Sequence, residues 1–342
     1  MSITPELAPM EAKLVETLPE GDGWQFEPKW NGFRCLAFKQ GDEVALVSKS
    51  GKPLARYFPE IASAIGALAV DRVVLDGELL IPVGDTLSFE ALQMRLHPAE
   101  SRVRRLSAET PAQLMLFDCL GWEEDLAGRP LAERRATLER FHAKHGTATL
   151  RLSPFTEDPE VARRWLEGAG GALDGVVAKR RDEPYRPGER AMLKVKRLRT
   201  ADCVVGGFRY ASGSRQVGSL LLGLYDDAGL LHHVGFTSAI AAADRPALTK
   251  QLEALVEAPG FTGDAPGGPS RWSTERSAEW QPLRPELVAE VRYDHVTGRR
   301  FRHGTGFLRW RPDKAPRQCT MEQLGSEARP AVVAAALAGA QA

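Results

Sequence analysis

The segment from residue 27 to residue 34, Glu-Pro-Lys-Trp-Asn-Gly-Phe-Arg, combines a lysine, a glycine turn and an arginine. A lysine amine can attack phosphorus once it is deprotonated, and burial or a neighbouring cation lowers its pKa enough for this. Gly32 lets the backbone approach a ligand closely, and Arg34 offers a planar guanidinium that binds a phosphate or holds a ribose. The pattern predicts a nucleophilic Lys29 on a tight turn. Most lysines beside a glycine are solvated surface residues, so this prediction depends on the rest of the chain.

Two acidic residues and a pair of lysines elsewhere in the chain could complete such a site. Glu78, in Val-Leu-Asp-Gly-Glu-Leu, and Asp174, in Leu-Asp-Gly-Val-Val-Ala-Lys, each lie in a strand-like segment next to a glycine. Phosphoryl transfer needs a divalent cation to neutralise developing charge, and Mg²⁺ binds few carboxylates plus waters. Lys194 and Lys196 alternate with apolar residues, so both project from one face of a strand. We expect Glu78 and Asp174 to bind the metal and the two lysines to supply a positive field.

The order of these segments resembles the motif series of the covalent nucleotidyltransferases, which are the ATP-dependent DNA ligases, RNA ligases and mRNA capping enzymes. The resemblance extends from about Glu27 to Lys314, nearly the whole chain. Within this family, the chain most resembles the short bacterial C-type ATP-dependent DNA ligases. The matching segments, in the order of the family's motifs, are residues 29–34, 74–79, 116–118, 173–179, 193–196 and 311–314.

The resemblance implies a role for each matching residue. Lys29 would attack the α-phosphorus of ATP, expel pyrophosphate and hold AMP as a lysyl phosphoramidate. Phe117 would stack on the adenine, although it would also suit an apolar core, and Glu27 would contact the adenine edge. Glu78 would contact the ribose or the metal, Mg²⁺ or Mn²⁺. The other residues that the resemblance places on the nucleotide are Arg34, Lys49, Arg190, Lys194 and Lys196.

The last motif, Arg-Pro-Asp-Lys, is typical of DNA ligases. By the resemblance, Arg311 and Lys314 orient the pyrophosphate leaving group while the C-terminal domain swings over the cleft. That domain then turns away to clamp DNA.

Three positions depart from the family pattern. Asn31 stands where the family has Asp, and an amide lacks the full negative charge of a carboxylate. Lys49 replaces an Arg, which keeps the charge but loses the bidentate fork. Asp174 replaces the usual Glu and offers the same ligand oxygens on a shorter side chain. We expect the Asn31 change to slow sealing or to alter the metal requirement.

The pattern of apolar residues predicts an α+β fold with two domains. Strands are expected at residues 43–48, 73–81 and 114–118, and helices at 132–143 and 159–166, the second after a capping segment at 156–158. After Lys196 come strands at 203–208, 218–225 and 230–236, a helix at about 243–258, and strands at 287–293 and 301–310. These short strands fit a small OB-fold β-barrel. We expect an adenylation (nucleotidyltransferase) domain over residues 1–199, an OB-fold domain over 200–322 and an Ala-rich tail over 323–342.

Charge and composition favour a soluble protein that binds nucleic acid. The formal net charge is zero, but residues 179–199 hold nine Lys or Arg against three acids, and residues 290–317 hold eight against three. Such segments can neutralise phosphates. The four cysteines are far apart, which indicates no disulfide framework or zinc site and a reducing cytoplasm. No apolar run approaches the roughly 20 residues that span a bilayer.

The favoured function is ATP-dependent sealing of 3′-hydroxyl and 5′-phosphate ends in nicked duplex DNA, in DNA repair, by a cytoplasmic, nucleoid-associated monomer. A Ku-type end-binding protein and a primase-polymerase are partners that only the C-type resemblance implies. Alternatives are a capping-type guanylyltransferase and, less favoured, an RNA ligase. A further alternative of another class is a non-catalytic nucleic-acid-binding module in which Asn31 records decay of the active site.

Overall fold

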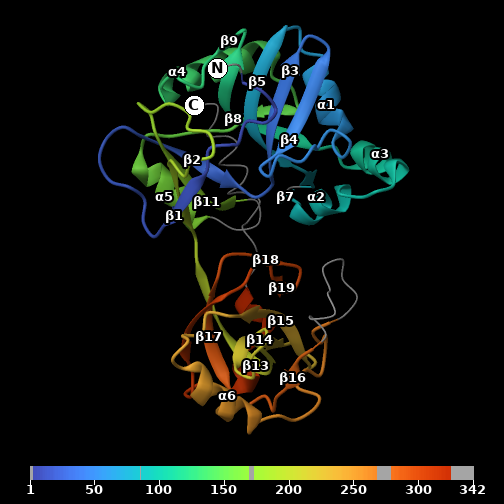
Figure 1. Ribbon diagram of the computed structural model, residues 1–342, viewed down its shortest axis with the longest axis vertical. Helices are drawn as coiled ribbons and strands as arrows, with labels where there is room; N and C mark the ends of the chain where they lie inside the picture. Colours follow the sequence, from blue (N-terminus) through green and yellow to red (C-terminus); the bar gives the residue numbers. More distant parts are fainter. Residues whose placement is uncertain (1–2, 85, 169–172, 268–278, 325–342) are drawn as a thin grey trace. The chain divides into compact units, whose positions relative to one another are not determined.

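The computed structural model describes residues 3–84, 86–168, 173–267 and 279–324. The chain forms two compact units that meet in sequence between Arg197 and Leu198 (Figure 1). The Ala-rich tail was predicted over residues 323–342, and residues 325–342 lie outside the described residues. None of the helices in the described ranges is long and apolar enough to span a membrane.

The first unit contains two main sheets. The four-stranded sheet has the order β1 (Ala12–Val15), β12 (Met192–Lys196), β11 (Leu173–Arg180) and β2 (Trp24–Trp30). The larger sheet has the order β10 (Leu150–Leu152), β8 (Gln113–Trp122), β5 (Arg72–Leu80), β3 (Phe33–Gln40) and β4 (Glu43–Ser48), and β9 (Glu124–Asp125) also pairs with β8. A short hairpin joins β6 (Pro82–Val83) and β7 (Thr86–Leu87). The strands predicted at residues 43–48, 73–81 and 114–118 are confirmed as β4, β5 and the centre of β8.

The described residues of the first unit form five helices. They are α1 (Pro59–Gly66), α2 (Phe89–Arg95), α3 (Glu100–Glu109), α4 (Leu131–His145) and α5 (Pro159–Glu167). The predicted helices at residues 132–143 and 159–166 are α4 and α5. The predicted cap is present, because the Asp158 carboxylate accepts a hydrogen bond from the Glu160 backbone N–H at 2.8 Å. Helices α1, α2 and α3 were not predicted.

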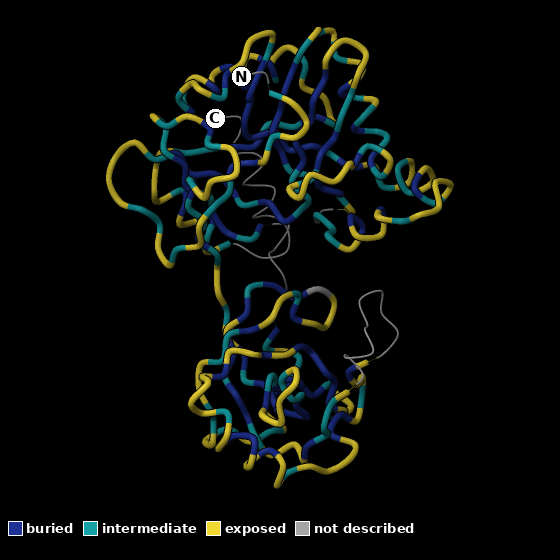
Figure 2. The backbone as a smooth tube through the Cα atoms, in the orientation of Figure 1, coloured by how far each residue is buried: buried dark blue, intermediate teal, exposed yellow. Residues whose placement is uncertain are grey.

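Strand alternation separates a core face from a polar face in the four-stranded sheet. Phe26 and Trp30 of β2 and Val176 of β11 pack in one apolar cluster, and α5 contacts both strands. The alternating residues of β2 and β12, including Lys29 and Lys194, lie on the other face. Lys29 therefore belongs to strand β2. The prediction that Lys29 lies on the turn is wrong, because the strand continues to Trp30 and the turn begins at Asn31. Figure 2 shows buried backbone concentrated in the sheets and exposed backbone in the connecting loops.

The second unit is built on one six-stranded sheet. Its order is β15 (Leu231–Thr237), β14 (Val217–Tyr225), β13 (Arg199–Tyr210), β17 (Val288–Tyr293) and β20 (Gly306–Trp310), and β16 (Gln281–Pro282) also pairs with β13. The predicted hairpin of β14 and β15 is confirmed. The remaining elements are α6 (Arg245–Glu253), β18 (Val296–Thr297), β19 (Arg300–Phe301) and the short 3₁₀ helices Pro316–Gln318 and Met321–Leu324.

Two elements of the second unit are shorter than expected. Helix α6 ends at Glu253 rather than near residue 258, and the strand expected over residues 301–310 is divided into β19 and β20. In the described residues, β15 meets the segment before β20 at an isolated parallel bridge, between Thr237 and Thr305. The Thr237 hydroxyl donates to the Thr305 carbonyl at 2.8 Å there. The α+β class and the OB-type strand arrangement are as predicted, but this contact joins the sheet edges without a continuous ladder that would close a barrel.

Candidate active site

A pocket of about 980 Å³ lies in the first unit, on the polar face of the four-stranded sheet. Its walls come from β2, β3, β5, β8, β11 and β12 and from residues 9–12, which precede and begin β1. The predicted site residues that line it are Glu27, Lys29, Arg34, Lys49, Glu78, Phe117 and Lys194. The fold thus brings together residues that are distributed over most of the first unit's sequence.

Lys29 forms an ion pair with Asp174 at the end of β2. The Lys29 Nζ atom donates to Asp174 Oδ2 at 2.7 Å, and Lys196 Nζ lies 3.8 Å from the same oxygen. The register explains this convergence, because Gly175 of β11 lies opposite both Lys29 and Lys196. Gly175 has φ +142°, and a Cβ atom there would lie 2.0 Å from the Val195 carbonyl oxygen. A glycine is therefore required between the two lysine strands.

Glu78, on β5, approaches the turn at Gly32 that follows β2. A Cβ atom on Gly32 would lie 2.2 Å from the Leu79 carbonyl oxygen and 2.8 Å from Glu78 Cγ, so only glycine permits this close approach. Burial raises the pKa of Glu78 to about 7, although the charges of Lys29 and Arg34 lower it. Glu78 therefore has a carboxyl group whose protonation changes near neutral pH.

Arg34 is held by a buried carboxylate. Its Nε and one terminal nitrogen donate to the two oxygens of Asp76 at 2.5 and 2.6 Å, and Asp76 is fully buried. The Tyr185 hydroxyl donates to the same carboxylate at 2.8 Å. Burial lowers the pKa of the Arg34 guanidinium, but the charge and hydrogen bonds of Asp76, with smaller contributions from Tyr185 and Glu78, together outweigh burial and raise that pKa above its ordinary value. Arg34 is thus a fixed positive charge in the pocket wall.

Phe117 reaches the pocket through an irregularity in β8. The pairing with β5 shifts between Asp118 and Leu116, so Phe117 is an extra residue on β8 and the two neighbours Phe117 and Asp118 escape strict alternation. The Arg34 guanidinium carbon and the Lys179 Nζ each lie 4.7 Å from the centroid of the Phe117 ring. The ring is buried but remains part of the pocket lining.

Lys179 is a pocket residue that the sequence reasoning missed. Its Nζ donates to Glu27 Oε2 at 2.7 Å, and both side chains are almost fully buried. Gln25 donates to the other Glu27 oxygen at 2.8 Å. The signal was present in the sequence, because Lys179 alternates with Gly175 and Val177 on β11 and so shares their face.

The predicted nucleotide contacts Lys49 and Arg190 lie at the rim and both approach Glu11. Lys49 Nζ is 3.1 Å and Arg190 Nε is 3.9 Å from Glu11 Oε2, and both basic side chains are exposed. Arg190 does not line the pocket. Lys194 is less exposed, and burial lowers its pKa, with Lys29, Lys196 and Lys49 adding like-charge repulsion. The pocket therefore has a cluster of ammonium groups.

Arg311 and Lys314 belong to the second unit, and the lining of this pocket comes from the first. One terminal nitrogen of Arg311 lies 2.9 and 3.1 Å from the two Asp202 oxygens. Its Nε and other terminal nitrogen donate to Asp313, at 2.8 Å for the shortest contact. Lys314 Nζ lies 3.6 Å from Asp202. Both basic residues thus share Asp202 as a counter-ion.

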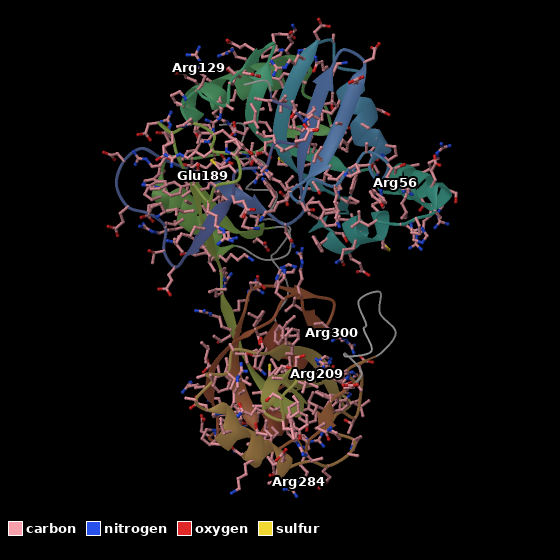
Figure 3. All side chains as sticks on the ribbon, viewed as in Figure 1. Arg56, Arg129, Glu189, Arg209, Arg284 and Arg300 are labelled. Carbon is pink, nitrogen blue, oxygen red and sulfur yellow. The ribbon has the colours of Figure 1, made fainter. Side chains whose placement is uncertain are left out.

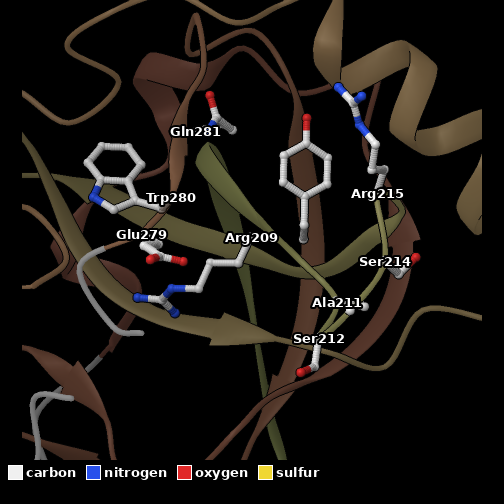
Figure 4. A pocket seen from close by; sticks show the side chains of 10 residues that line it. Arg209, Ala211, Ser212, Ser214, Arg215, Glu279, Trp280 and Gln281 are labelled. Carbon is white, nitrogen blue, oxygen red and sulfur yellow. The ribbon is translucent and has the colours of Figure 1, made fainter. Parts of the chain in front are cut away.

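A second pocket, of about 750 Å³, lies in the second unit (Figure 4). Its lining includes Tyr210, Arg215 and Trp280 beside the turn that joins β13 to β14. Arg209 lies in the same lining, and burial and the charge of Arg300 lower the pKa of its guanidinium. Figure 3 labels Arg209 and Arg300 in this unit. The sequence reasoning did not identify this pocket.

Asp174 and Glu78 are the predicted ligands of a divalent cation. Among the residues that the structure describes, no three His, Cys, Asp or Glu side chains gather as a metal site of their own. The two predicted ligands, Asp174 and Glu78, both act on Lys29, one by a direct ion pair and the other electrostatically. Two carboxylates with substrate phosphates are a ligand set that suits Mg²⁺. The residues therefore fit a cation that binds together with a nucleotide.

Comparisons with known proteins identify the family of the chain. The family model for the ATP dependent DNA ligase domain matches residues 5–196, and the model for the ATP dependent DNA ligase C terminal region matches residues 213–314. The chain is 47% identical to DNA ligase C2 of Mycolicibacterium smegmatis, over 95% of this chain and 96% of that protein. It is 44% identical to DNA ligase C of Mycobacterium tuberculosis, over 95% of each.

A solved structure from a structure–function analysis of Lig E DNA ligases shares the fold, with a TM-score of 0.56 and 16% identity. The alignment covers 88% of this chain and 99% of that one. The matches to both family models, together with the identity over nearly the full length, show that the chain belongs to the ATP-dependent DNA ligases.

Proposed function

We propose that this protein seals nicks in duplex DNA in three chemical steps. The Lys29 Nζ atom attacks the α-phosphorus of ATP, so that a phosphorus–nitrogen bond forms and pyrophosphate leaves. The AMP group then passes to the 5′-phosphate of the nick and Lys29 is released. The 3′-hydroxyl finally attacks that phosphate, and AMP leaves. The observation that carries the proposal is the Lys29–Asp174 pair at 2.7 Å, beside a pocket whose lining includes Lys29, Arg34 and Phe117.

The pocket residues supply what the first step requires. Lys29 must lose a proton before it attacks. Lys194 is its neighbour in the cluster of ammonium groups, and burial together with the charges of Lys29, Lys196 and Lys49 lowers the pKa of Lys194. Arg34 holds a positive charge that can bind the nucleotide, and Phe117 offers an aromatic face for the adenine. Glu27, fixed by Lys179, is placed to accept from the adenine edge.

A divalent cation, Mg²⁺ or Mn²⁺, bound by Asp174 and Glu78 would neutralise charge on the phosphates. Lys49 and Arg190, both exposed, would contact the nucleotide or the DNA phosphate from the rim. Arg311 and Lys314 would bind the pyrophosphate end of ATP after they leave Asp202. The proposed adenylation domain comprises residues 1–199, and the proposed OB-fold domain comprises residues 200–322.

We also propose a role in DNA repair as a nucleoid-associated cytoplasmic monomer. The names of the relatives, DNA ligase C and C2, support the C-type assignment. A Ku-type end-binding protein and a separate primase-polymerase are the partners proposed on that basis. Joining assays with and without these proteins would test the association.

The first experiment is incubation of the purified protein with α-labelled ATP and Mg²⁺ or Mn²⁺. The protein is first treated with pyrophosphate to remove bound AMP. We expect an acid-labile labelled adduct in the wild type, none in Lys29→Ala, and a normal adduct in the control Lys144→Ala, which changes an exposed lysine of α4. A nicked duplex should then be joined with release of AMP.

The other outcomes separate the alternatives. An adduct with GTP and not ATP would indicate a capping-type enzyme. Joining of nicked RNA and not DNA would indicate an RNA ligase. Salt-sensitive DNA binding without any adduct would indicate a binding module and would contradict the proposal.

A further inference from the structure

One wall of the large pocket is formed by residues 9–12, which carry none of the recognised motifs. Backbone contacts tie this segment to the chain before β12. The Glu11 N–H donates to the Glu189 carbonyl at 2.7 Å, and the Met192 N–H donates to the Glu11 carbonyl at 3.1 Å. The Met10 N–H has a different partner, since it donates to the Tyr185 hydroxyl at 2.9 Å. The wall is thus attached to a side chain as well as to backbone.

Tyr185 is buried and uses its hydroxyl in both directions. The oxygen accepts from the Met10 N–H and the proton is donated to Asp76 Oδ2 at 2.8 Å. A buried carboxylate is stable only when its oxygens are paired, and Asp76 has three donors from two side chains. Tyr185 supplies one of them and Arg34 supplies the other two. A phenylalanine at position 185 would keep the ring and lose both hydrogen bonds.

Arg34 connects this buried group to the pocket. One of its terminal nitrogens also lies 3.4 Å from the Met10 carbonyl oxygen, so Arg34 and Tyr185 contact the two polar groups of the same residue. The guanidinium carbon is 4.7 Å from the centroid of Phe117. The direction of the Arg34 fork therefore depends on how Asp76 is held, and Asp76 is held by Tyr185.

We infer that Tyr185 is a positioning residue for nucleotide binding. Through Asp76 it sets the direction of Arg34, and through the Met10 N–H it sets the position of the 9–12 wall. The inference rests on the proposed function, because it assumes that the pocket binds ATP. Tyr185 itself need not touch the nucleotide. The competing explanation is a tyrosine that only stabilises the fold.

The test measures single-turnover adenylation of Lys29 over a range of ATP concentrations in Tyr185→Phe. Loss of the Asp76 contact should raise the half-saturating ATP concentration by about tenfold, which corresponds to ~1.4 kcal/mol of binding free energy. The maximal rate should fall much less, because Lys29 and Asp174 are unchanged. The control is Tyr225→Phe, which alters a buried tyrosine of the second unit and should change neither quantity.

A double-mutant cycle separates positioning from general stability. If Tyr185 acts through Arg34, then Arg34→Ala and the double variant Arg34→Ala/Tyr185→Phe should have similar half-saturating concentrations, and the effects should not add. Fully additive effects, or an unchanged half-saturating concentration in Tyr185→Phe, would overturn the inference. Asp76→Asn keeps the side-chain shape and should raise the half-saturating concentration at least as much. If Tyr185→Phe does not fold, Asp76→Asn tests the link from Asp76 to Arg34 on which the inference depends, and an unchanged half-saturating concentration in it would overturn the inference.

Failure of the two proposals can be distinguished in one experiment. If the wild type forms no adduct at Lys29, the proposed function is wrong. If the wild type forms the adduct and Tyr185→Phe binds ATP equally well, only the positioning role is wrong.

Discussion

The Oδ2 atom of Asp174 lies 2.7 Å from Lys29 Nζ and 3.8 Å from Lys196 Nζ. One carboxylate thus faces two amines from the strands on either side of β11. Gly175, next to Asp174, lies opposite both lysines, and the absence of a side chain there allows the strands to meet. Asp174 is therefore both the partner of the proposed nucleophile and a proposed ligand of the cation.

Asp174→Asn should reduce the rate of Lys29 adenylation by at least ~100-fold, because the amide neither compensates the amines nor binds a divalent cation strongly. Asp174→Glu should retain more activity, since it keeps the charge and the ligand oxygens. The measurement is single-turnover transfer of labelled AMP at saturating ATP. Asp182→Asn, at an exposed acid of the same unit, is the control. Equal rates for Asp174→Asn and the wild type would exclude both roles of Asp174.

Asn31 occupies the position where the family has Asp, and its side chain is buried. Asn31→Asp should increase a single-turnover rate of adenylation or sealing, by about tenfold if the carboxylate contributes ~1.4 kcal/mol to a transition state. Each step is measured separately, with Mg²⁺ and with Mn²⁺. Thermal unfolding of the variant shows whether the buried charge reduces stability. No gain at any step with either metal would contradict the expectation that the amide slows sealing.

Asp202 pairs with both Arg311 and Lys314, at 2.9 and 3.6 Å. Its charge competes with any phosphate for these two cations. Asp202→Asn should therefore lower the ATP concentration needed for adenylation by about threefold to tenfold, as expected for the loss of one charge interaction of ~1 kcal/mol. Sealing of DNA that already carries AMP should not change.

Glu290→Gln is the matched control for Asp202→Asn. Glu290 lies opposite Asp202 in the ladder of β13 and β17 and pairs with Arg309, at 2.6 Å. The Glu290 charge also acts on Arg311, but Glu290 makes its ion pair with Arg309, so Glu290→Gln should change the ATP dependence much less than Asp202→Asn. A higher ATP requirement in Asp202→Asn would mean that Asp202 assists Arg311 and does not compete with the nucleotide.

The buried His233 of β15 should make stability depend on pH. Burial, reinforced by Arg300 and Arg209, lowers its pKa from 6.5 to about 3. Between these values the unfolded chain binds a proton that the folded chain excludes, so stability falls as the pH falls from about 6.5 to 3. At ~1.4 kcal/mol per pKa unit, this contribution could reach about 5 kcal/mol.

His233→Asn should flatten that acid dependence, whatever its effect at neutral pH. Denaturant unfolding at several pH values measures the difference between the variant and the wild type. His303→Asn, at an exposed histidine, should leave the slope unchanged. A constant difference between wild type and His233→Asn from pH 7 to pH 4 would falsify the assignment.

The local rules of sequence determined much of this protein. Alternation on β12 placed Lys194 and Lys196 on one face, and the apolar pattern located β4, β5, α4 and α5. The glycines beside Asp174 and in the turn after Asn31 marked points where strands approach closely. These features depend on a strand's period of two residues and on backbone conformation, so a short window of sequence contains them.

Only the tertiary structure decided which charged groups meet. Lys179 pairs with Glu27 across 152 residues, and Tyr185 with Asp76 across 109. The first pairing follows from a sheet order of β1, β12, β11 and β2, which is not the order of the chain, and the second joins the loop after β11 to β5 of the larger sheet. The tertiary structure also decided the bulge that turns Phe117 into the pocket and the short contact between β15 and the segment before β20. These outcomes depend on the packing of whole sheets, because the stability of each pair is set by burial that distant segments provide.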